Sequence, residues 1–312
     1  MEFTLLGRTG LQASVAGLGC GGHSRLGMAR GESEDHAANV VRHALDLGIN
    51  FIDTALAYGT EAAVGQGISG RRHELILSTK TPVRNRDGLL SGEDIKGNLE
   101  SSLQALRTDY IDVFNLHGMT LPEYDHVKRD VLPVLLEARA QGKIRFLGVT
   151  ERFNTDQRHE MLAHVLPDDH FDVVMVGFNF LNPGARDNVF PLTVENNVGT
   201  QIMFAVRRAL ASNEGIAEVV DSLLERNEIV EAAMENDKGF EFLSAHPEVK
   251  SLTEAAYRFC RHEPGADITL TGTGSRDHLT ENVASILAPP LPAALLERLA
   301  AIVPGATSAT AN

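Results

Sequence analysis

The most constraining feature of this sequence is a regular alternation of short apolar runs with longer amphipathic stretches, which continues along nearly the whole chain. The apolar runs have the length of buried strands and lie at 15–18, 49–52, 74–77, 111–116, 146–149, 173–178, 201–205 and 268–270. The stretches between them place apolar residues three and four positions apart, as one face of a helix requires. Strands that alternate with helices form parallel sheets, and the even spacing favours a closed (β/α)8 TIM barrel over an open sheet.

Residues suited to begin a helix precede several of the amphipathic stretches. Their side-chain oxygens can accept hydrogen bonds from the free N–H groups of the first helical turn. The expected N-caps are Ser33, Ser91, Asn154 and Ser251. Asp94 and Glu254 follow two of these serines by three positions, which predicts a capping box at each helix start.

Two segments fall outside the barrel repeat. Residues 3–13 carry a glycine-containing turn between two apolar runs and predict a β-hairpin before the first barrel strand. Residues 207–250, after the seventh strand, contain an extra amphipathic helix around Ile216 and Val220. Because this segment follows a strand end, we expect it over the barrel mouth, either as a solvated excursion or as a wall of the substrate pocket.

The length of the chain is compatible with one domain. It has 312 residues, and (β/α)8 barrels of ~250 residues or more fold as one unit. We therefore assign residues 1–312 to a single barrel domain. Residues 304–312 are small and mostly polar, and are expected to form a loose tail.

The composition of the chain limits where in the cell we expect the protein and which molecules we expect it to bind. A formal net charge of −14 with no compensating basic run predicts that neither nucleic acid nor an anionic membrane surface is a partner. No apolar run reaches transmembrane length and the N-terminus lacks the pattern of a signal peptide, so we expect a cytoplasmic protein. Cys20 and Cys260 lie far apart without metal-ligand spacing, which favours reduced thiols and no metal site.

One glycine motif suggests a dinucleotide site of another fold. The pattern Gly17-x-Gly19-x-x-Gly22 follows the first predicted strand, as in the Rossmann fingerprint. However, residues 25–32 show no helical stripe, and residues 65–70 match the same pattern inside a helical stretch. A Rossmann fold needs a helix that opens at the glycines, so we do not assign one.

Ionisable residues stand at the ends of three consecutive strands. Asp53 closes the second strand, Lys80 the third and His117 the fourth, and Tyr58 follows Asp53 by five residues. In a parallel barrel the carboxyl ends of the strands meet at the face that carries the chemistry. The four side chains are therefore predicted to form one cluster.

These residues carry a resemblance to the aldo-keto reductase family. Its Asp, Tyr, Lys and His tetrad corresponds to Asp53, Tyr58, Lys80 and His117, within the motif Asn-Phe-Ile-Asp-Thr-Ala-x-x-Tyr-Gly. The resemblance extends from Leu-Gly-Arg-Thr-Gly near the start to Gly-Thr-Gly and His-Leu-x-Glu-Asn near the end. It implies a (β/α)8 barrel whose hairpin plugs the bottom, and a nicotinamide dinucleotide laid across the mouth.

The resemblance also assigns contacts to that cofactor. The Ser-Asn pair that holds the carboxamide corresponds to Thr150 and Glu151, the glutamine of the sixth strand to Met175, and the stacking aromatic to Phe204, Ala205 or Val206, with Arg207 beside them. The segment 271–282 resembles the adenosine-phosphate clamp, in which the candidates are Thr273, Gly274, Ser275, Arg276, His278 and Asn282. The resemblance implies that the cofactor is NADP(H). NAD(H) is the alternative, because His278 replaces a common arginine.

The predicted cluster suits the reduction of a carbonyl group. Lys80, held by Asp53, is expected to lower the pKa of Tyr58 so that the phenol can protonate the carbonyl oxygen, while His117 hydrogen-bonds to that oxygen. No side chain here can donate the electrons, so a hydride must come from the cofactor. The expected activity is oxidoreduction of a small aldehyde, ketone or alcohol by a monomer or homo-oligomer.

Two other functions remain open on the sequence. A barrel that binds the dinucleotide but serves as a regulatory subunit would keep most of these residues, and the altered carboxamide contacts favour it slightly. An aldolase or lyase would use Lys80 to form a Schiff base. The intact tetrad favours the reductase over both.

Overall fold

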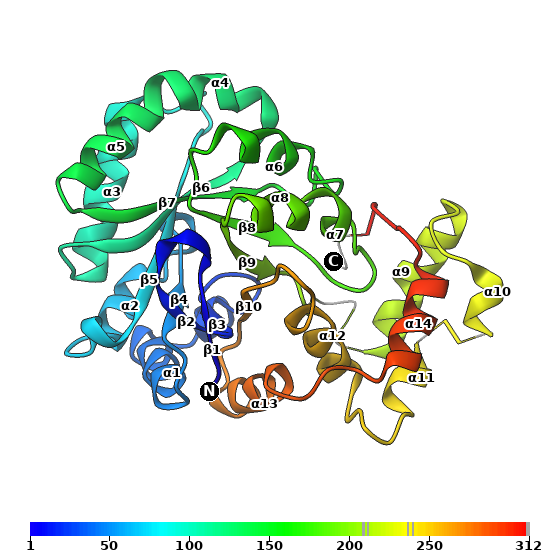
Figure 1. Cartoon of the computed structure of the whole chain (residues 1–312). Coiled ribbons are helices and arrows are strands. Elements are labelled where there is room, and N and C mark those ends of the chain that lie inside the picture. The colour runs from blue at the N-terminus through cyan, green and yellow to red at the C-terminus, as the bar shows by residue number, and fades with distance from the viewer. Residues whose placement is uncertain (208–209, 211, 236, 239, 310–312) are drawn as a thin grey trace.

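The computed structural model describes residues 1–207, 210, 212–235, 237–238 and 240–309, and its centre is a closed barrel of parallel strands (Figure 1). Parts of the expected insertion (208–209, 211, 236 and 239) and of the expected tail (310–312) lie outside the described residues. The barrel strands are β3 (Ala16–Gly19), β4 (Phe51–Asp53), β5 (Ile76–Pro82), β6 (Ile111–Met119), β7 (Ile144–Glu151), β8 (Val173–Gly177), β9 (Gly199–Met203) and β10 (Ile268–Thr271). The predicted TIM barrel is thus confirmed.

Helices cover the outside of the barrel. They are α1 (Glu34–Asp46), α2 (Glu61–Gly67), α3 (Gly92–Leu106), α4 (Tyr124–His126), α5 (Leu132–Ala140), α6 (Glu160–Val165), α7 (Ala185–Asn188), α8 (Phe190–Glu195), α9 (Asn213–Glu225), α10 (Glu231–Met234), α11 (Glu241–Ser244), α12 (Leu252–Arg261), α13 (Arg276–Ile286) and α14 (Ala293–Ile302). Short 3-10 or π turns are η1 (Gly7–Thr9), η2 (Arg25–Arg30), η3 (Leu56–Tyr58), η4 (Arg72–Glu74), η5 (Leu121–Glu123), η6 (Val127–Val131) and η7 (Leu166–Asp168).

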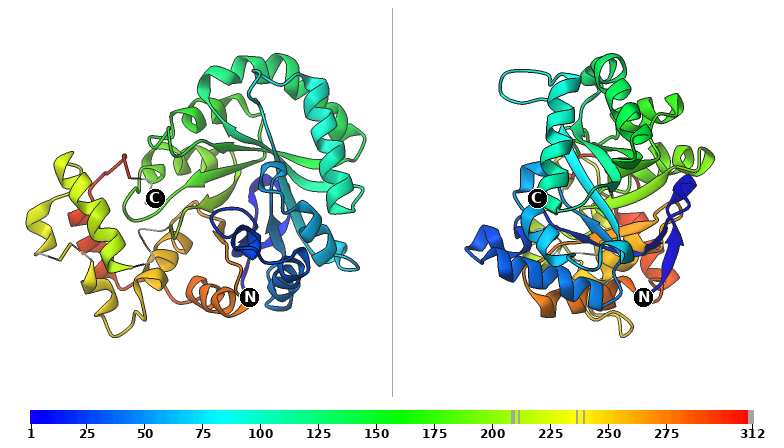
Figure 2. Two further views of the ribbon diagram at one scale, coloured as in Figure 1. Left: turned by 180° about the vertical axis from the view of Figure 1, so that it is seen from behind. Right: turned by 90° about the vertical axis from the view of Figure 1, so that its left-hand side faces the viewer.

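The N-terminal hairpin closes one end of the barrel. Its strands β1 (Phe3–Leu5) and β2 (Gln12–Ser14) pair antiparallel. The buried Leu6 and Ala13 of the hairpin pack in one cluster with inward side chains of the strands, which are Phe51, Ile76, Val113, Val173 and Ile268. In the side view of Figure 2 (right), the hairpin (dark blue) and the loop after β5 (cyan) lie at opposite ends of the barrel. The C-terminal ends of the strands, which carry Asp53, Lys80 and His117, are therefore left open at the opposite end of the barrel.

The strand register sets the positions of the predicted site residues. Asp53 pairs with Ser78 in the neighbouring strand, and Lys80 pairs with Asn115. His117 lies beside Pro82. Side chains along each strand point alternately into and out of the barrel. These pairings therefore place the polar groups one layer above the apolar cluster formed by the hairpin and the strands.

Two of the predicted helix starts differ from expectation. Ser33 and Ser91 cap α1 and α3, and the capping box with Asp94 is present. Ser251 accepts from the backbone N–H of Glu254, but the Glu254 carboxylate forms an ion pair with Arg258. Asn154 does not open α6, since the carboxylate of Asp156 accepts from the N–H groups of the first turn of that helix, at 2.9 Å each.

The segment 207–250 does contain the predicted extra helix, α9. Arg207, its first residue, lines the cavity at the barrel mouth, but its helices do not lie over that mouth. Figure 1 shows α9, α10 and α11 (yellow-green and yellow) beside α14 (red), at the side of the barrel. The backbone N–H of Val230 donates to the carbonyl of Ile302 at 2.8 Å, which ties the segment to the end of α14. An apolar helix face packs against another apolar helix in preference to the polar mouth.

The expected loose tail is packed in its described part, residues 304–309. The Glu228 carboxylate accepts from the backbone N–H groups of Thr307 and Ser308, at 2.8 and 2.9 Å. Asn182 donates to the carbonyl of Ala309 at 3.2 Å. Small side chains allow the backbone to approach these partners closely, a feature that composition alone does not distinguish from disorder. Throughout the described part of the chain, every helix is too short or too polar to cross a membrane.

Candidate active site

The structure brings the four predicted residues into one cluster. Lys80 is fully buried, and its Nζ donates to both carboxylate oxygens of Asp53, at 2.6 and 2.8 Å, and to the carbonyl of Thr54 at 2.8 Å. The same Nζ lies 5.0 Å from the centre of the Tyr58 ring. The ring of His117 meets that of Tyr58 edge to face, with 5.4 Å between centroids.

A second layer of hydrogen bonds holds the Asp53 carboxylate in place. The Ser78 hydroxyl donates to Asp53 Oδ1 at 2.8 Å, and the side-chain amide of Asn115 donates to Ser78 Oγ at 3.0 Å. All three residues are buried. Each comes from a different strand of the barrel, so the network fixes the carboxylate relative to the scaffold and, through it, the ammonium of Lys80.

The electrostatics of the cluster are set by burial as much as by charge. Although burial alone disfavours an ammonium, the oxygens of Asp53 and Tyr58 raise the pKa of Lys80, which stays charged. Burial raises the pKa of Tyr58 above its ordinary value, and the opposing pull of Lys80 does not overcome it. The expected lowering of the Tyr58 pKa by Lys80 is thus present, but burial outweighs it, and the net pKa in the protein alone is raised. Burial, with Lys80 and Arg152, lowers the pKa of His117 to about 3, so this imidazole is neutral at physiological pH.

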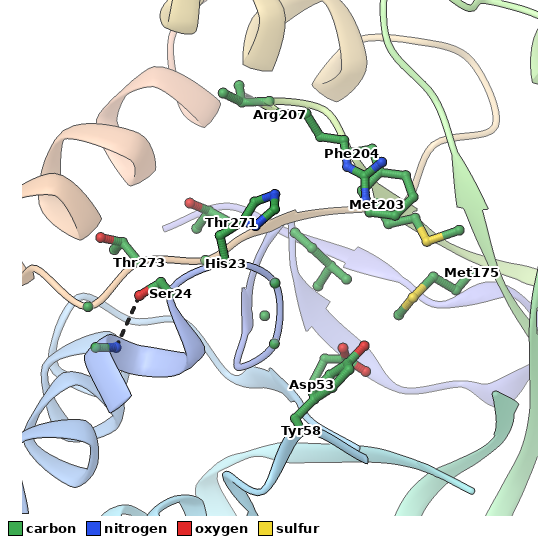
Figure 3. Close-up of a pocket in the computed structure, with 18 of the residues that line it drawn as sticks. His23, Ser24, Asp53, Tyr58, Met175, Met203, Phe204, Arg207, Thr271 and Thr273 are labelled. Carbon is green, nitrogen blue, oxygen red and sulfur yellow. Dashed lines mark hydrogen bonds between the residues drawn. The ribbon is translucent and has the colours of Figure 1, made fainter. Parts of the chain in front are cut away.

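A cavity of about 1320 Å³ opens at this face of the barrel. In Figure 3, Asp53 and Tyr58 lie at its base, Met175, Met203 and Phe204 on one side, and His23, Ser24 and Thr273 on the other. Lys80 is absent from the described lining residues, because its ammonium is enclosed by Asp53 and Thr54. That position disfavours a Schiff base with a bound carbonyl compound.

Two glycines of the motif that resembles a Rossmann fingerprint, Gly19 and Gly22, line this cavity instead. Gly19 ends β3, and Gly21 and Gly22 belong to the loop that follows it. A Cβ atom at Gly21 would lie 2.5 Å from the Tyr58 ring, so the missing side chain lets this loop pack flat against the tyrosine. A Cβ atom at Gly274 would lie 2.5 Å from the backbone of Gly27, which shows an equally close approach at the far end of the cavity. Sequence reasoning missed this loop, although its glycine density was a signal for close backbone approach.

The residues predicted to contact the carboxamide line the cavity, but the side-chain oxygens of Thr150 and Glu151 already accept hydrogen bonds within the protein. The Thr150 hydroxyl accepts from the backbone N–H of Gly118 at 2.7 Å. The carboxylate of Glu151 accepts from Nδ1 of His159 at 2.9 and 3.0 Å, and from the N–H of Gly177 at 2.7 Å. Met175 is buried in the wall of the cavity.

Phe204 is the aromatic residue that faces the cavity after the seventh barrel strand. Of the alternatives, Ala205 is fully buried, whereas Val206 also reaches the lining. The guanidinium carbon of Arg207 lies 3.4 Å from the centre of the Phe204 ring, and its Nη1 donates to Asn154 Oδ1 at 3.0 Å. Burial lowers the pKa of Arg207 to about 10, so the group remains a cation at neutral pH.

The predicted phosphate clamp occupies the other end of the cavity. Thr273, Gly274, Ser275, Arg276 and His278 all line it, at the N-terminus of α13. The Ser275 hydroxyl accepts from the backbone N–H of His278, and Thr273 Oγ1 accepts from the N–H of Ser275. Asn282 is not among the described lining residues, because its amide donates to Thr271 Oγ1 at 2.9 Å. This hydrogen bond supports the end of β10.

The structure also adds lining residues that the sequence did not single out. His23 and Arg30 approach the clamp, and Arg152, Phe153 and Asn154 follow β7 at the other end. Consecutive residues after a barrel strand are expected at the mouth, so their position after Glu151 was the available signal.

Comparison with known proteins agrees with this geometry. A model of the aldo/keto reductase family matches residues 18–304. An aldo-keto reductase of Bacillus subtilis is 31% identical over 293 residues, which cover 87% of this chain and 85% of the relative. L-galactose dehydrogenase of Arabidopsis thaliana is 27% identical over 298 residues, 92% of this chain and 88% of the relative.

Solved structures give the same result. The holo form of an aldo-keto reductase from Bacillus halodurans superposes with a TM-score of 0.71 at 26% identity, over 96% of this chain and 95% of the other. The sequence match and the structural match both span the barrel and the cluster at its mouth. The chain therefore belongs to the aldo/keto reductase family, whose members are oxidoreductases that use a nicotinamide cofactor on small-molecule carbonyl compounds.

Proposed function

We propose that this chain transfers a hydride between NADP(H) and an aldehyde or ketone, with Tyr58 as the proton donor. The observation that carries the proposal is the cluster of Asp53, Lys80, Tyr58 and His117 at the base of the cavity. In this cluster Tyr58 can supply a proton and His117 a hydrogen bond to the same carbonyl oxygen, and the charged ammonium of Lys80 lies beside the tyrosine ring.

The cavity fits a nicotinamide dinucleotide. Its volume of about 1320 Å³ exceeds the ~300–1,000 Å³ of common small-molecule pockets, which leaves room for a cofactor and a substrate together. Arg30 and Arg276 line the end formed by the N-terminus of α13, a position that suits phosphate groups. Two arginines at this end support NADP(H) over NAD(H).

The residues of the chain then divide the chemistry between them. The bound nicotinamide supplies the hydride. The phenol of Tyr58 donates its proton to the carbonyl oxygen, and the ammonium of Lys80 stabilises the phenolate that remains. His117, neutral because its pKa is lowered to about 3, donates a hydrogen bond to the same oxygen and does not act as the acid.

Replacement of the proton donor tests the proposal. Tyr58→Phe is expected to reduce kcat for aldehyde reduction by ~10²–10⁴-fold, as loss of a general acid does. NADPH affinity, measured by fluorescence titration, is expected to change little because the ring is retained. Near-normal turnover in Tyr58→Phe would refute the role of the tyrosine. A wild-type protein that binds NADPH but reduces no aldehyde in a broad panel would favour the regulatory alternative.

A further inference from the structure

Arg152 is a half-buried cation in the active-site cavity. It follows Glu151 at the end of β7 and lines the cavity beside His117 and Gly118. A Cβ atom at Gly118 would lie 3.8 Å from Arg152 Nε, which places the side chain directly against that backbone. Its charge is felt at His117, whose pKa it helps to lower.

The acidic groups near Arg152 are committed to other partners. Asp53 is bound by Lys80, and the Glu151 carboxylate accepts from His159 and Gly177. Within the described residues, the carboxylates all lie beyond 4.0 Å from the guanidinium of Arg152. Arg207 also lines the cavity, but its guanidinium lies on the ring of Phe204. Arg152 thus brings a positive charge to the cavity beside His117, in a protein of net charge −14.

A guanidinium without a carboxylate partner is suited to bind one from a ligand. Its planar fork matches a carboxylate with two parallel hydrogen bonds, and partial burial strengthens the pair relative to one in water. Because Arg152 adjoins His117, the carbonyl oxygen of a ligand can reach Tyr58 and His117 while a carboxylate on the same molecule reaches Arg152.

We propose that Arg152 selects carboxylate-bearing aldehydes or ketones as substrates. The inference rests on the proposed reductase function and names its substrate class. Arg152 binds the carboxylate in the ground state and in the transition state, and the tetrad carries out the reduction. A carboxylate is favoured over a phosphate because one guanidinium balances its single charge.

Matched substrates test this selection. 4-Carboxybenzaldehyde and its methyl ester, methyl 4-formylbenzoate, differ only in the charged group. In wild-type protein kcat/KM is expected to be at least ~10-fold higher for the acid. Arg152→Gln is expected to reduce that preference by ~10–100-fold, mainly through KM, and Arg152→Lys to reduce it less, because the charge remains while the fork is lost. The 2- and 3-carboxy isomers locate the preferred distance between the carbonyl and carboxylate groups.

Controls separate this inference from the function on which it rests. Arg158→Gln removes an exposed arginine of the same loop that is not among the cavity-lining residues, and is expected to keep the wild-type preference. Turnover of the neutral ester, lost in Tyr58→Phe, tests the reductase function without any anion. If the ester is reduced but Arg152→Gln keeps the wild-type acid-to-ester ratio, or weakens NADPH binding instead, the selection by Arg152 is refuted.

A binding measurement tests the role of Arg152 even if the protein reduces no aldehyde. Calorimetric titration of terephthalate into the protein with NADP+ is expected to show weaker binding to Arg152→Gln than to the wild type or to Arg158→Gln. Equal affinity in all three proteins would overturn the inference even if no aldehyde were reduced.

Discussion

Substitution of Glu151 by alanine is expected to destabilise the fold much more than it affects the cofactor. Both side chains of the Glu151–His159 pair have no exposed surface. Glu151 accepts from Nδ1 of His159 and from the N–H of Gly177, and His159 adopts a left-handed backbone conformation with φ of 61°. Nε2 of His159 has no partner within the described residues. Loss of the carboxylate would thus leave a buried imidazole and a buried amide N–H unbonded.

The magnitude follows from these contacts. Each buried group left without a partner costs ~1–3 kcal/mol, and removal of one member of a buried pair costs ~3–5 kcal/mol, so we expect a loss of ~4 kcal/mol. For a chain of 312 residues, an unfolding entropy of ~2.1 cal/mol/K per residue gives ~0.66 kcal/mol per degree. The expected drop in Tm is therefore ~6 °C. Glu151→Gln retains an acceptor for Gly177 and is expected to lose less than half as much.

Thermal unfolding followed by circular dichroism, together with NADP(H) titration, separates the two roles that Glu151 could have. The sequence suggested that Glu151 contacts the nicotinamide carboxamide. That role predicts weaker cofactor binding in Glu151→Ala with a Tm near that of the wild type. Glu160→Ala, in the exposed first turn of α6, is the matched control. A Tm of Glu151→Ala within ~1 °C of the control would show that the buried pair does not stabilise the fold as argued.

Two further substitutions test neighbouring features. Met175→Gln introduces an amide into the cavity wall and is expected to tighten NADP(H) binding by ~0.5–1.5 kcal/mol, the worth of one neutral hydrogen bond; unchanged affinity in calorimetry would mean that the nicotinamide lies elsewhere. Burial raises the pKa of Asp267 from 3.8 to about 6, so its carboxyl stabilises the fold at low pH and this contribution is lost as pH rises through about 6. Asp267→Asn lacks this titration. Its free energy of unfolding in urea, taken relative to that of the wild type, is therefore expected to rise between pH 4 and 6 and to stay constant above that range. The rise is at most ~3 kcal/mol, and partial solvation of the carboxyl makes it smaller. A flat difference across this range would contradict the raised pKa.

The barrel and the cluster of Asp53, Lys80, Tyr58 and His117 were predictable because their signals are local and periodic. A strand buried on both faces needs a short apolar run, and a barrel brings the ends of such runs together. Asp53, Lys80 and His117 each stand at the end of one run. Their meeting point therefore follows from the order of the strands without knowledge of any side-chain packing.

The features that escaped prediction depend on contacts between distant residues. Nothing near Glu151 in the sequence indicates that its carboxylate turns to His159 and away from the cavity. The tail at 304–309 is held by Glu228, a residue about 80 positions earlier. The described part of the segment 207–250 packs against α14 because both present apolar faces, and a helix pattern gives the face but not its partner.

The raised pKa of Tyr58 has a consequence for the direction of the proposed reaction. Sequence reasoning gave the sign of the interaction with Lys80, but it could not give the depth of burial, which outweighs that interaction. An ordinary phenol has a pKa of ~10, so a raised value keeps Tyr58 protonated across the neutral range. Reduction needs a protonated Tyr58 as acid, whereas alcohol oxidation needs its phenolate as base. In the protein without its cofactor, Tyr58 is therefore in the form that the proposed reduction needs at neutral pH. The rate of the proposed alcohol oxidation is expected to increase as the pH rises toward the pKa of the phenol.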